Sequence, residues 1–483
     1  MQLTTPPARG ASYLPWIIAF VEGFSTLAVE VIAIRLAIPV VGSSITLTGV
    51  MLGVVLFALS AGYWRGGALS AEWDRNKTRA ALSRNLLLAA VLYGAVAFPF
   101  EARLMEKLLD MGVPLSWSIG LAASLLFILP IYLASQTVPM LAELTNDDGK
   151  AGKASGKVLF FSTVGSVVGG IVTPVWLFPT FGVAHSTFVV CGLLAIAAGV
   201  MAMGHYRAVK EVAAGSVALL LVVAGTALAG QEPDLFHFDS EYQSIRVVEE
   251  KDDGPAIRIM MVGGGRASGI FSESGKTAFE YTQLGAQMVA DTKARNVLVV
   301  GAAGFTLPRD AAALSTVEHV DAIDVDPAVK GIAEKYFLQS ALSEKVRFVP
   351  LSGRYAMHKL RSEGRQYDFA FIDAYFGRGL PEELSTAEFF ADVKRLSSRT
   401  AANVIMDRKL TSDFARNLLA TFSHVFGQTW VTDVKPGDTD ISNMMVTTWP
   451  IPGAVEWKGA GSVYFDDNNT VDKDHVRLIW SNE

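Results

Sequence analysis

Charged residues, cysteines and histidine clusters are all scarce in this sequence. Only 18% of its 483 residues are charged and 51% are hydrophobic, a balance too apolar for an ordinary soluble protein. One cysteine, Cys191, lies in an apolar run, which excludes a disulfide framework and a cysteine-based metal site. The seven histidines show no metal-ligand spacing, and a net charge of -6 argues against nucleic acid. We therefore expect neither a bound metal nor a nucleic-acid partner.

The apolar residues are concentrated in the first half of the chain, in runs near the length of about twenty residues that a bilayer requires. Seven such runs predict seven transmembrane helices, at 14–41, 45–63, 80–99, 118–142, 157–180, 184–204 and 212–230. The stretch EARLMEKLLDMG, between the third and fourth runs, predicts an amphipathic helix at the membrane interface. Because the sequence becomes polar after Gly230, we expect a membrane domain over 1–230 and a second domain over 231–483.

A few residues of the membrane half require an explanation. Glu22, Glu30 and Arg35 place charges in the first predicted helix, where they indicate either a transport or substrate-entry pathway or a structural ion pair. The small residues of Gly165–Gly169 favour close packing against another helix. Two prolines, Pro130 and Pro139, predict kinks in the fourth helix.

The second half alternates strand and helix patterns. Segments at 243–250, 256–262 and 267–271, separated by turn signals at 252–254 and 263–265, predict a small antiparallel unit within 231–275. Within 276–483, strands are predicted at 296–300, 319–324, 346–350, 368–373 and 402–407, and helices between them at 307–315, 327–338, 354–363 and 386–396. Such alternation indicates a doubly wound parallel sheet, which the segments around Trp430 and 444–448 would close with an antiparallel edge.

Four polar or small residues stand at the ends of these strands: Gly301, Asp324, Ser352 and Asp373. In doubly wound sheets, ligands bind at the carboxyl ends of the strands. The loop of Gly and Ala at 301–304 lets the backbone approach a ligand, and Asp324 could accept hydrogen bonds from a ribose diol. Asp373 could take a proton from an attacking amine. The alternative for each acid is a carboxylate that caps a turn.

Several segments together resemble one family. They are SEYQSIRVVEE (240–250), EYTQL, VLVVGAAG, AIDVDP, YDFAFIDAYFGRGLP and ELSTAEFF. These resemble the spermidine synthases, or polyamine aminopropyltransferases, and GFSTLAVEVIAIRLAIPVVGSS is similar to the opening of their membrane-fused bacterial members. The resemblance implies a Rossmann-like, seven-stranded methyltransferase-type domain behind a small β unit. It also implies decarboxylated S-adenosylmethionine, or S-adenosylmethionine, as co-substrate, a polyamine-like amine as acceptor, release of methylthioadenosine, and an assembly that could be a homo-oligomer.

The same resemblance assigns roles to particular residues. Asp373 would be the proton acceptor. The adenosyl ligand would contact Gln243, Gly301, Ala302, Gly304, Asp324, Ser352 and Gly353, and the amine would contact Tyr281, Gln283 and Tyr375.

Four positions depart from the pattern of the soluble family. Gly304 and Ser352 replace acids, Thr282-Gln283 replaces a His-Glu pair, and Phe376 replaces the second acid of the Asp373 loop. Because a diamine pocket normally offers several carboxylates, these departures weaken the polyamine assignment more than the nucleoside assignment.

Three functions remain open: alkyl transfer from a sulfonium to an amine, a membrane transporter or sensor whose soluble domain binds a nucleoside or polyamine without chemistry, and methyl transfer or cleavage of S-adenosylmethionine. Sidedness is also open. Basic residues gather at 65–79, 150–157 and 207–210, which places the N-terminus in the cytoplasm and, after seven crossings, the catalytic domain outside. Since S-adenosylmethionine is used in the cytosol, we expect one segment not to cross and a multi-pass protein of the inner membrane whose catalytic domain is cytoplasmic.

Overall fold

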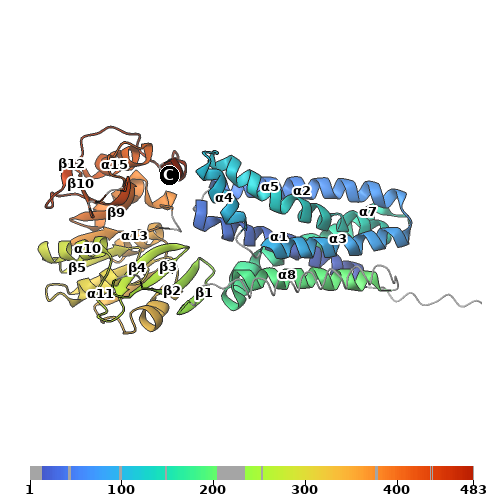
Figure 1. Ribbon diagram of the computed structural model, residues 1–483, viewed down its shortest axis with the longest axis horizontal. Coiled ribbons are helices and arrows are strands. Elements are labelled where there is room, and N and C mark those ends of the chain that lie inside the picture. The colour runs from blue at the N-terminus through green and yellow to red at the C-terminus, as the bar shows by residue number, and fades with distance from the viewer. Residues whose placement is uncertain are drawn as a thin grey trace, which may run out of the picture. The chain divides into compact units, whose positions relative to one another are not determined.

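The chain forms two compact units in a computed structural model (Figure 1). The model describes residues 13–41, 45–96, 100–146, 149–203, 234–251, 254–375, 379–435, 437 and 439–481. One unit comprises Met1–Leu36, Thr46–Met105 and Ser116–Gly230, and the other comprises Ala37–Ile45, Glu106–Leu115 and Gln231–Glu483.

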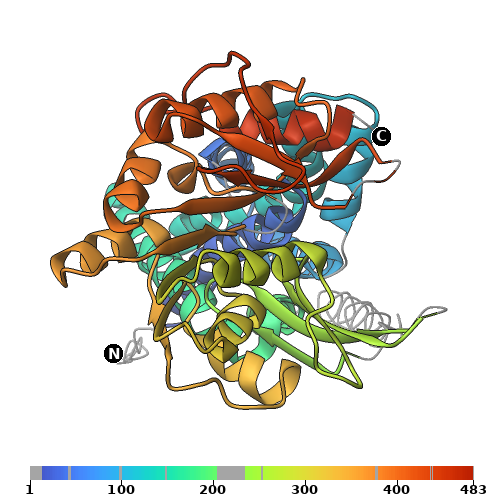
Figure 2. The same cartoon turned by 90° about the vertical axis from the view of Figure 1, so that its left-hand side faces the viewer.

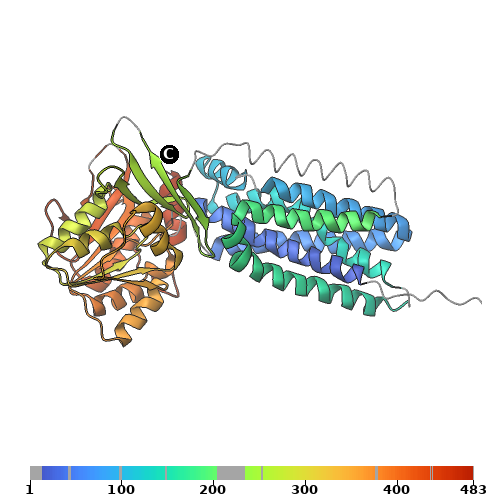
Figure 3. The same cartoon turned by 90° about the horizontal axis from the view of Figure 1, so that it is seen from below.

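The first unit is helical, and its long helices run alongside one another (Figure 3). The helices of the N-terminal part of the chain, which supply this unit, are α1 (Leu14–Val41), α2 (Ile45–Glu72), α3 (Arg75–Val96), α4 (Phe100–Asp110), α5 (Leu115–Ser135), α6 (Thr137–Leu144), α7 (Ala151–Val172), the π-helical turn η1 (Thr173–Leu177) and α8 (Phe178–Ala202). The helix at α4 is the one predicted from EARLMEKLLDMG.

Four helical spans in the described part of the chain are long and apolar enough to cross a membrane. They are Leu14–Ile38, Thr46–Glu72, Leu115–Leu144 and Ala151–Ala202. The last span contains Gly182 in a non-helical conformation (φ 76°), which separates the fifth and sixth predicted runs. The third run, 80–99, overlaps α3 as far as Val96, and the seventh, 212–230, lies outside the described residues. The predicted number of seven crossings therefore stays a prediction.

Small residues bring α1 and α7 into close contact. A Cβ atom on Gly23 would lie 1.9 Å from the carbonyl oxygen of Ser162, and one on Gly165 would lie 2.1 Å from that of Phe20. The Ser162 hydroxyl donates a hydrogen bond to Glu22 Oε2 at 2.9 Å. The predicted small-residue face is thus confirmed, and Glu22 is a buried acceptor within the interface that this face forms.

Two further residues singled out in the helical unit, Arg35 and Pro139, can be related to particular contacts. The guanidinium of Arg35 lies over the ring of Phe178 in α8, 5.7 Å from its centroid, so Arg35 contacts a second helix. The fourth apolar run is interrupted at Gln136, between α5 and α6. A proline ring clashes with the carbonyl of the residue four positions before it. Pro139 stands four residues after Ser135, the last residue of α5, so this clash explains why α5 ends there.

The second unit begins with an antiparallel meander in the order β1-β2-β3-β4 (Figure 2). Its strands are β1 (Phe236–Asp239), β2 (Ser244–Glu250), β3 (Ile257–Val262) and β4 (Gly265–Phe271). The last three confirm the prediction. Strand β1 was not predicted because its four residues, FHFD, carry only two apolar side chains; one of them, Phe236, stacks on Tyr336 with centroids 3.8 Å apart. The turn predicted at Asp252-Asp253 lies outside the described residues.

A larger sheet follows, in the order β12-β10-β11-β9-β8-β5-β6-β7. Its strands are β5 (Asn296–Val300), β6 (His319–Asp324), β7 (Val346–Pro350), β8 (Phe369–Ile372), β9 (Thr400–Asp407), β10 (Trp430–Asp433), β11 (Ile441–Thr447) and β12 (Val455–Glu456). Strands β5 to β9 pair in parallel and β9, β11, β10 and β12 pair antiparallel, so the predicted doubly wound sheet and its antiparallel edge are confirmed. The count of seven strands is wrong by one, because the two-residue β12 adds a further edge.

Helices cover both faces of this sheet. They are α10 (Glu280–Asp291), α11 (Thr306–Ala313), α12 (Ala328–Ile332) with the π-helical turn η2 (Ala333–Phe337), α13 (Gly353–Ser362), the short 3-10 helix η3 (Glu382–Leu384), α14 (Ala387–Leu396), α15 (Asp413–Phe426) and α16 (Val471–Ser481). Alternate residues of β5 feed two separate cores: Leu298 and Val300 pack with residues of α13 to α15, whereas Val297 and Val299 pack with residues of α10 to α12. The run VLVV at 297–300 is apolar throughout because both faces of the strand are buried there.

A buried carboxylate links neighbouring strands of the sheet. Asp321 of β6 is fully buried and accepts hydrogen bonds from Arg347 Nε at 2.6 Å, Arg347 Nη2 at 2.8 Å and the Tyr367 hydroxyl at 2.5 Å. Burial alone would raise the pKa of Asp321, but the bonds from Arg347 and Tyr367 outweigh it, so the pKa lies below its ordinary value. The carboxylate therefore stays ionised in the core because the guanidinium of Arg347 donates hydrogen bonds to it.

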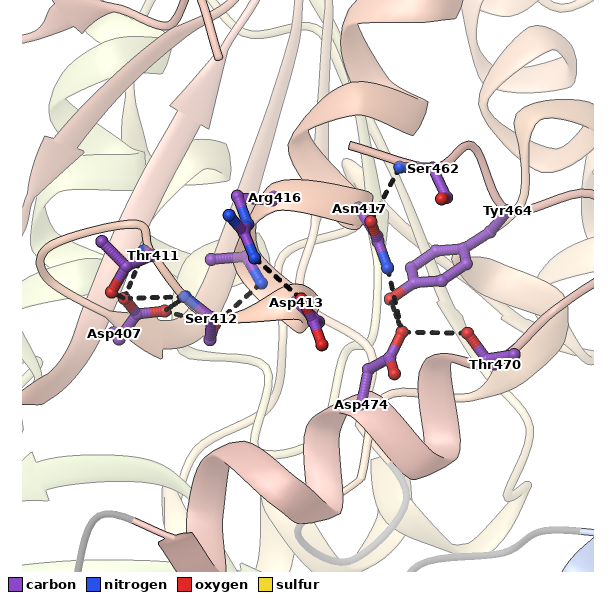
Figure 4. A network of polar contacts seen from close by, with 11 residues as sticks. Asp407, Thr411, Ser412, Asp413, Arg416, Asn417, Ser462, Tyr464, Thr470 and Asp474 are labelled. Carbon is purple, nitrogen blue, oxygen red and sulfur yellow. Dashed lines mark hydrogen bonds and ion pairs between the residues drawn. The ribbon is translucent and has the colours of Figure 1, made fainter. Parts of the chain in front are cut away.

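A second carboxylate anchors the last helix (Figure 4). Oδ2 of Asp474 in α16 accepts hydrogen bonds from Asn417 Nδ2 of α15 at 3.1 Å, from the Tyr464 hydroxyl at 2.8 Å and from Thr470 Oγ1 at 2.9 Å. These bonds fix α16 to α15, and Ile479 of α16 then lines the cavity described below.

Candidate functional site

A large cavity lies at the carboxyl ends of β5, β6, β8 and β9, with a volume of about 1360 Å³. Strand β5 has β6 on one side and β8 on the other, so this is the point at which the strand order reverses and where such sheets bind ligands. The predicted site residues that line the cavity are Gln243, Tyr281, Gly301, Asp324, Ser352, Gly353, Asp373 and Tyr375.

Three predicted site residues lie elsewhere. Ala302 is buried, and its amide donates to the carbonyl of Ile323 at 3.0 Å. The amide of Gly304 donates to Ser268 Oγ at 3.2 Å, and a Cβ atom there would lie 2.6 Å from Ser268 Cβ. Gln283 turns its side-chain amide to the carbonyl of Thr277 at 2.8 Å. Each of these groups is engaged by the protein, so their positions do not support the direct ligand contacts expected of them.

The loop after β5 has an unusual backbone. Gly301 has φ 95°, and a Cβ atom there would lie 1.9 Å from the carbonyl oxygen of Asp373, so the position accepts only glycine. Ala303 and Phe305 also have positive φ, at 39° and 57°, a conformation that costs non-glycine residues on the order of 1–3 kcal/mol each. The buried ring of Phe305, packed edge-on to Phe348 at 5.3 Å, holds this loop in place.

Asp324 ends β6 beside this loop. Its Oδ2 accepts a hydrogen bond from the amide of Ala303 at 3.0 Å and its Oδ1 accepts one from the amide of Asp326 at 3.1 Å. Burial raises the pKa of Asp324 to about 6, although these backbone bonds act in the opposite direction. Since each carboxylate oxygen has two lone pairs, both oxygens can still accept a hydroxyl from the cavity.

Gln243 is positioned by a contact that the sequence did not reveal. The Ser240 hydroxyl accepts a hydrogen bond from the amide of Gln243 at 2.9 Å and contacts Asp326 Oδ2 at 2.5 Å. The turn before β2 is thereby tied to the segment after β6, and Gln243 and Asp324 face the same cavity.

Asp373 follows β8 on the other side of the cavity. Its Oδ1 accepts a hydrogen bond from Asn403 Nδ2 at 2.9 Å. The Tyr281 hydroxyl lies beside this carboxylate and can give its one proton either to it or to the carbonyl of Ala267, which is 2.8 Å away. Burial raises the pKa of Asp373 to about 6, against the effect of the bonds from Asn403 and Tyr281. A carboxylate with this pKa is ionised at neutral pH and can receive a proton there.

Asn403 of β9 is a site residue that sequence reasoning missed. It lies in the run TAANVIMD, where it reads as an ordinary strand residue, and its contact with Asp373 depends on the pairing of β8 with β9. The one available signal was an amide among the apolar residues of 401–406. The neighbouring Tyr375 is fixed by β9 as well, because its hydroxyl accepts the amide of Ile405 at 2.8 Å. Phe376, which replaces a family acid, lies outside the described residues.

Three basic side chains that line the cavity each lie near an acid. Lys435 Nζ lies 2.7 Å from Glu280 Oε1, Arg408 Nε lies 3.2 Å from Asp433 Oδ2, and Arg266 Nη2 lies 2.9 Å from Glu250 Oε2. Among the described residues, no group of three or more His, Cys, Asp or Glu side chains could hold a metal ion.

Comparisons with known proteins give two kinds of match. A family model described as O-methyltransferase matches residues 275–377. The polyamine aminopropyltransferase of Vibrio vulnificus is 31% identical over 143 residues, which cover 30% of this chain and 47% of that protein. Polyamine aminopropyltransferase 1 of Streptomyces coelicolor is 24% identical over 400 residues, which cover 76% of this chain and 71% of that protein.

The matches differ in extent. The chain spans about half the length of the Vibrio relative and of a polyamine aminopropyltransferase from Alkaliphilus oremlandii, at 47% and 54%. Residues 231–483 are 253 of 483, or 52% of the chain, so the Streptomyces match at 76% also takes in part of the helical half. A probable spermidine synthase structure from Corynebacterium glutamicum is 18% identical, covers 44% of this chain and 80% of its own, and has a TM-score of 0.37, too low to add weight. The resemblance to the polyamine aminopropyltransferases is confirmed by the sequence relatives.

Proposed function

We propose that this protein is a membrane-bound transferase that moves an aminopropyl-type group from decarboxylated S-adenosylmethionine, or a closely related sulfonium, to an amine and releases methylthioadenosine. One observation carries the proposal: an acid suited to a ribose, Asp324, and an acid suited to a base, Asp373, line the same cavity at the switch point of the sheet. The aminopropyltransferase names of the sequence relatives support it.

The chemistry needs positioning and one base. The amine nitrogen attacks the carbon next to the sulfonium, the new C–N bond forms, and the electron pair of the breaking C–S bond goes to sulfur, which becomes a neutral thioether. The proton lost from nitrogen goes to the Asp373 carboxylate. Asp324 and Gln243 would hold the nucleoside on the other side of the cavity, so that the reacting atoms meet in line.

Methyl transfer is the second candidate, because the matched family model is an O-methyltransferase model that includes Asp324 and Asp373. The two reactions give different products. Incubation with the decarboxylated and the complete co-substrate, followed by chromatography, distinguishes them: methylthioadenosine supports the proposal, and S-adenosylhomocysteine would replace it with methyl transfer.

Removing the Asp324 carboxylate should weaken nucleoside binding. Hydrogen bonds to a charged group contribute roughly 1.5–3 kcal/mol, so Asp324→Ala should raise the dissociation constant of methylthioadenosine by about ten- to a hundredfold. Titration calorimetry on the detergent-solubilised protein measures it. Asp291→Ala, which removes an exposed acid from the end of α10, is the control and should bind normally. An unchanged dissociation constant for Asp324→Ala would exclude the ribose assignment.

We also propose that the helical unit spans the inner membrane and that the catalytic unit is cytoplasmic. The four apolar spans support the first part, and the cytosolic supply of S-adenosylmethionine supports the second. A reporter fused after Glu483 tests sidedness: a cytosol-only fluorescent protein should fluoresce there. Alkaline phosphatase activity from the same position, without fluorescence, would place the catalytic unit outside and contradict a cytosolic role.

A further inference from the structure

The helical unit contains a buried carboxyl group whose partners are all neutral. Glu22 is 1% exposed and lies in the apolar span Leu14–Ile38. Ser162 Oγ of α7 donates to its Oε2 at 2.9 Å, and Thr26 Oγ1 of α1 lies 3.4 Å from its Oε1. In the part of the chain that the structure describes, no Lys, Arg or His forms an ion pair with it. A buried carboxylate without a cation is costly, so the charge state of this group needs an explanation.

The two distances match a neutral carboxyl group better than an ionised one. Hydroxyls that donate to an ionised carboxylate typically lie about 2.5–2.7 Å away, as the Tyr367 hydroxyl does at 2.5 Å from the ionised Asp321. At Glu22 both hydroxyls are farther away. The 2.9 Å contact from Ser162 fits a carbonyl oxygen at Oε2. Oε1, which has no close donor, is then the oxygen that can carry a proton.

Two more hydroxyls near Glu22 are buried and unbonded. The side chains of Ser25 in α1 and Tyr93 in α3 are 0% exposed, and neither hydroxyl has a hydrogen-bond partner among the described residues. Tyr93 lies close enough to Glu22 to interact with it electrostatically, and Ser25 is three residues along the same helix, on a neighbouring position of its surface. A negative charge would draw such rotatable protons to itself. Their unbonded state therefore agrees with a neutral carboxyl group.

Close packing between α1 and α7 excludes larger ligands from the contact of Glu22 with Ser162. A Cβ atom on Gly23 would lie 1.9 Å from the carbonyl oxygen of Ser162. One turn further along α7, Ser166 Oγ donates to the carbonyl of Gly23 at 3.1 Å. The two backbones touch, so neither a metal ion with its coordination shell nor an ammonium group fits between them. A proton needs no such space.

We propose that Glu22 binds a proton at Oε1 and exchanges it with the solution, which gives the helical unit a binding function of its own. The inference does not depend on the proposed alkyl transfer. The other titratable groups that face this site are Tyr63 of α2 and Tyr93 of α3, with Cys191 of α8 beside Tyr93. Phenols and thiols are neutral at neutral pH, so the exchangeable charge belongs to Glu22. When the proton leaves, a negative charge arises inside the bundle, where a transmembrane potential or pH gradient acts on it.

Infrared spectroscopy of the full-length protein in lipid nanodiscs tests the site, because the C=O stretch of a neutral carboxyl group is separate from the bands of carboxylates. At about pH 6 an ordinary Glu is almost fully ionised. The difference spectrum of wild type minus Glu22→Gln should nevertheless contain the band of one protonated carboxyl group. The band should move on transfer to D2O and weaken reversibly as the pH is raised. Glu143→Gln, at an exposed position near the end of α6, is the matched control and should remove no such band.

A second variant leaves Glu22 in place, so the test does not depend on whether Glu22→Gln folds. Ser162→Ala removes the donor to the carbonyl oxygen Oε2, so the band of the protonated carboxyl group should move to higher wavenumber and keep its area. Ser166→Ala removes a hydroxyl of the same helix that bonds to the backbone instead, and it should leave the band in place.

Several results would overturn the inference. They are a difference spectrum without the band, a band that does not respond to D2O or to pH, and a band at the same wavenumber in Ser162→Ala and the wild type. Each would show that Glu22 does not hold an exchangeable proton in the assigned geometry. The proposed alkyl transfer would stand in every case, because it is measured by the release of methylthioadenosine.

Discussion

The variant Asp373→Asn should lose about 10²- to 10⁴-fold in turnover, the usual contribution of a general base, while it still binds methylthioadenosine. Asparagine preserves the shape of the side chain and can still bond with Asn403 and Tyr281, but it cannot take the proton that leaves the amine. Rapid-quench measurement of methylthioadenosine release gives turnover, and calorimetry gives the binding constant.

The pH dependence of the wild type provides an independent check of the same residue. Because the pKa of Asp373 is raised to about 6, the ionised fraction and hence kcat should fall about tenfold per pH unit below that value and level off above it. Asp291→Asn, at an exposed position, is the matched control and should keep both the rate and the profile. Near-normal turnover by Asp373→Asn would make Asp373 a structural cap and favour the transporter or sensor alternative.

The variant Arg347→Met should be the most destabilising single change in the catalytic unit outside the cavity. It removes the Arg347 guanidinium from the fully buried Asp321, and breaking a buried ion pair typically costs roughly 3–5 kcal/mol of the free energy of unfolding. Hydrogen exchange at the amides of β6 and β7, in the detergent-solubilised full-length protein, should show that the free energy of opening is lower in the variant by that amount.

A matched exposed pair and the pH dependence make this expectation specific. Arg295 and Glu318 also form an ion pair, but more than half of each side chain is exposed, so Arg295→Met should change the stability by less than about 1 kcal/mol. The folded-state pKa of Asp321 is lowered, so its stabilising contribution is present above the unfolded pKa and is lost as the pH falls through the folded pKa. The difference between Arg347→Met and the wild type should therefore shrink on acidification, and equal protection at neutral pH would refute the role of the pair.

The catalytic sheet could be predicted because its strands are buried on both faces. The run VLVV at 297–300 is apolar at every position, which is typical of a central parallel strand, and the two cores on either side of β5 show that both of its faces are buried. Strand β1 and helix α16 were not predicted, because each is short and partly polar and is stabilised by distant partners, Tyr336 for β1 and the Asn417–Asp474 contact for α16. Local pattern carries no information about such partners.

The same distinction applies to the candidate site, where residues at strand ends could be predicted and a residue that depends on strand pairing could not. Residues at the ends of strands, such as Asp324 and Asp373, are brought together by the sheet itself, so their spacing in the sequence was enough. Asn403 was missed because its role arises from the pairing of β8 with β9, thirty residues away. Gln283 was expected at the cavity from family resemblance, but its amide is taken by the carbonyl of Thr277.

The missing Cβ of Gly301 has a consequence for anyone who wishes to engineer this protein. The loop that would face the nucleoside packs at Gly301 directly against the backbone of Asp373, the residue that would act as the base. A Cβ atom on residue 301 would lie 1.9 Å from the carbonyl oxygen of Asp373. A library that varies residue 301 would displace both the loop after β5 and the backbone of Asp373. A change in donor preference could then not be separated from a loss of rate. Variation aimed at the donor should keep 301 fixed and begin at the lining residues Ser352 and Gln243, whose side chains project from other segments of the chain.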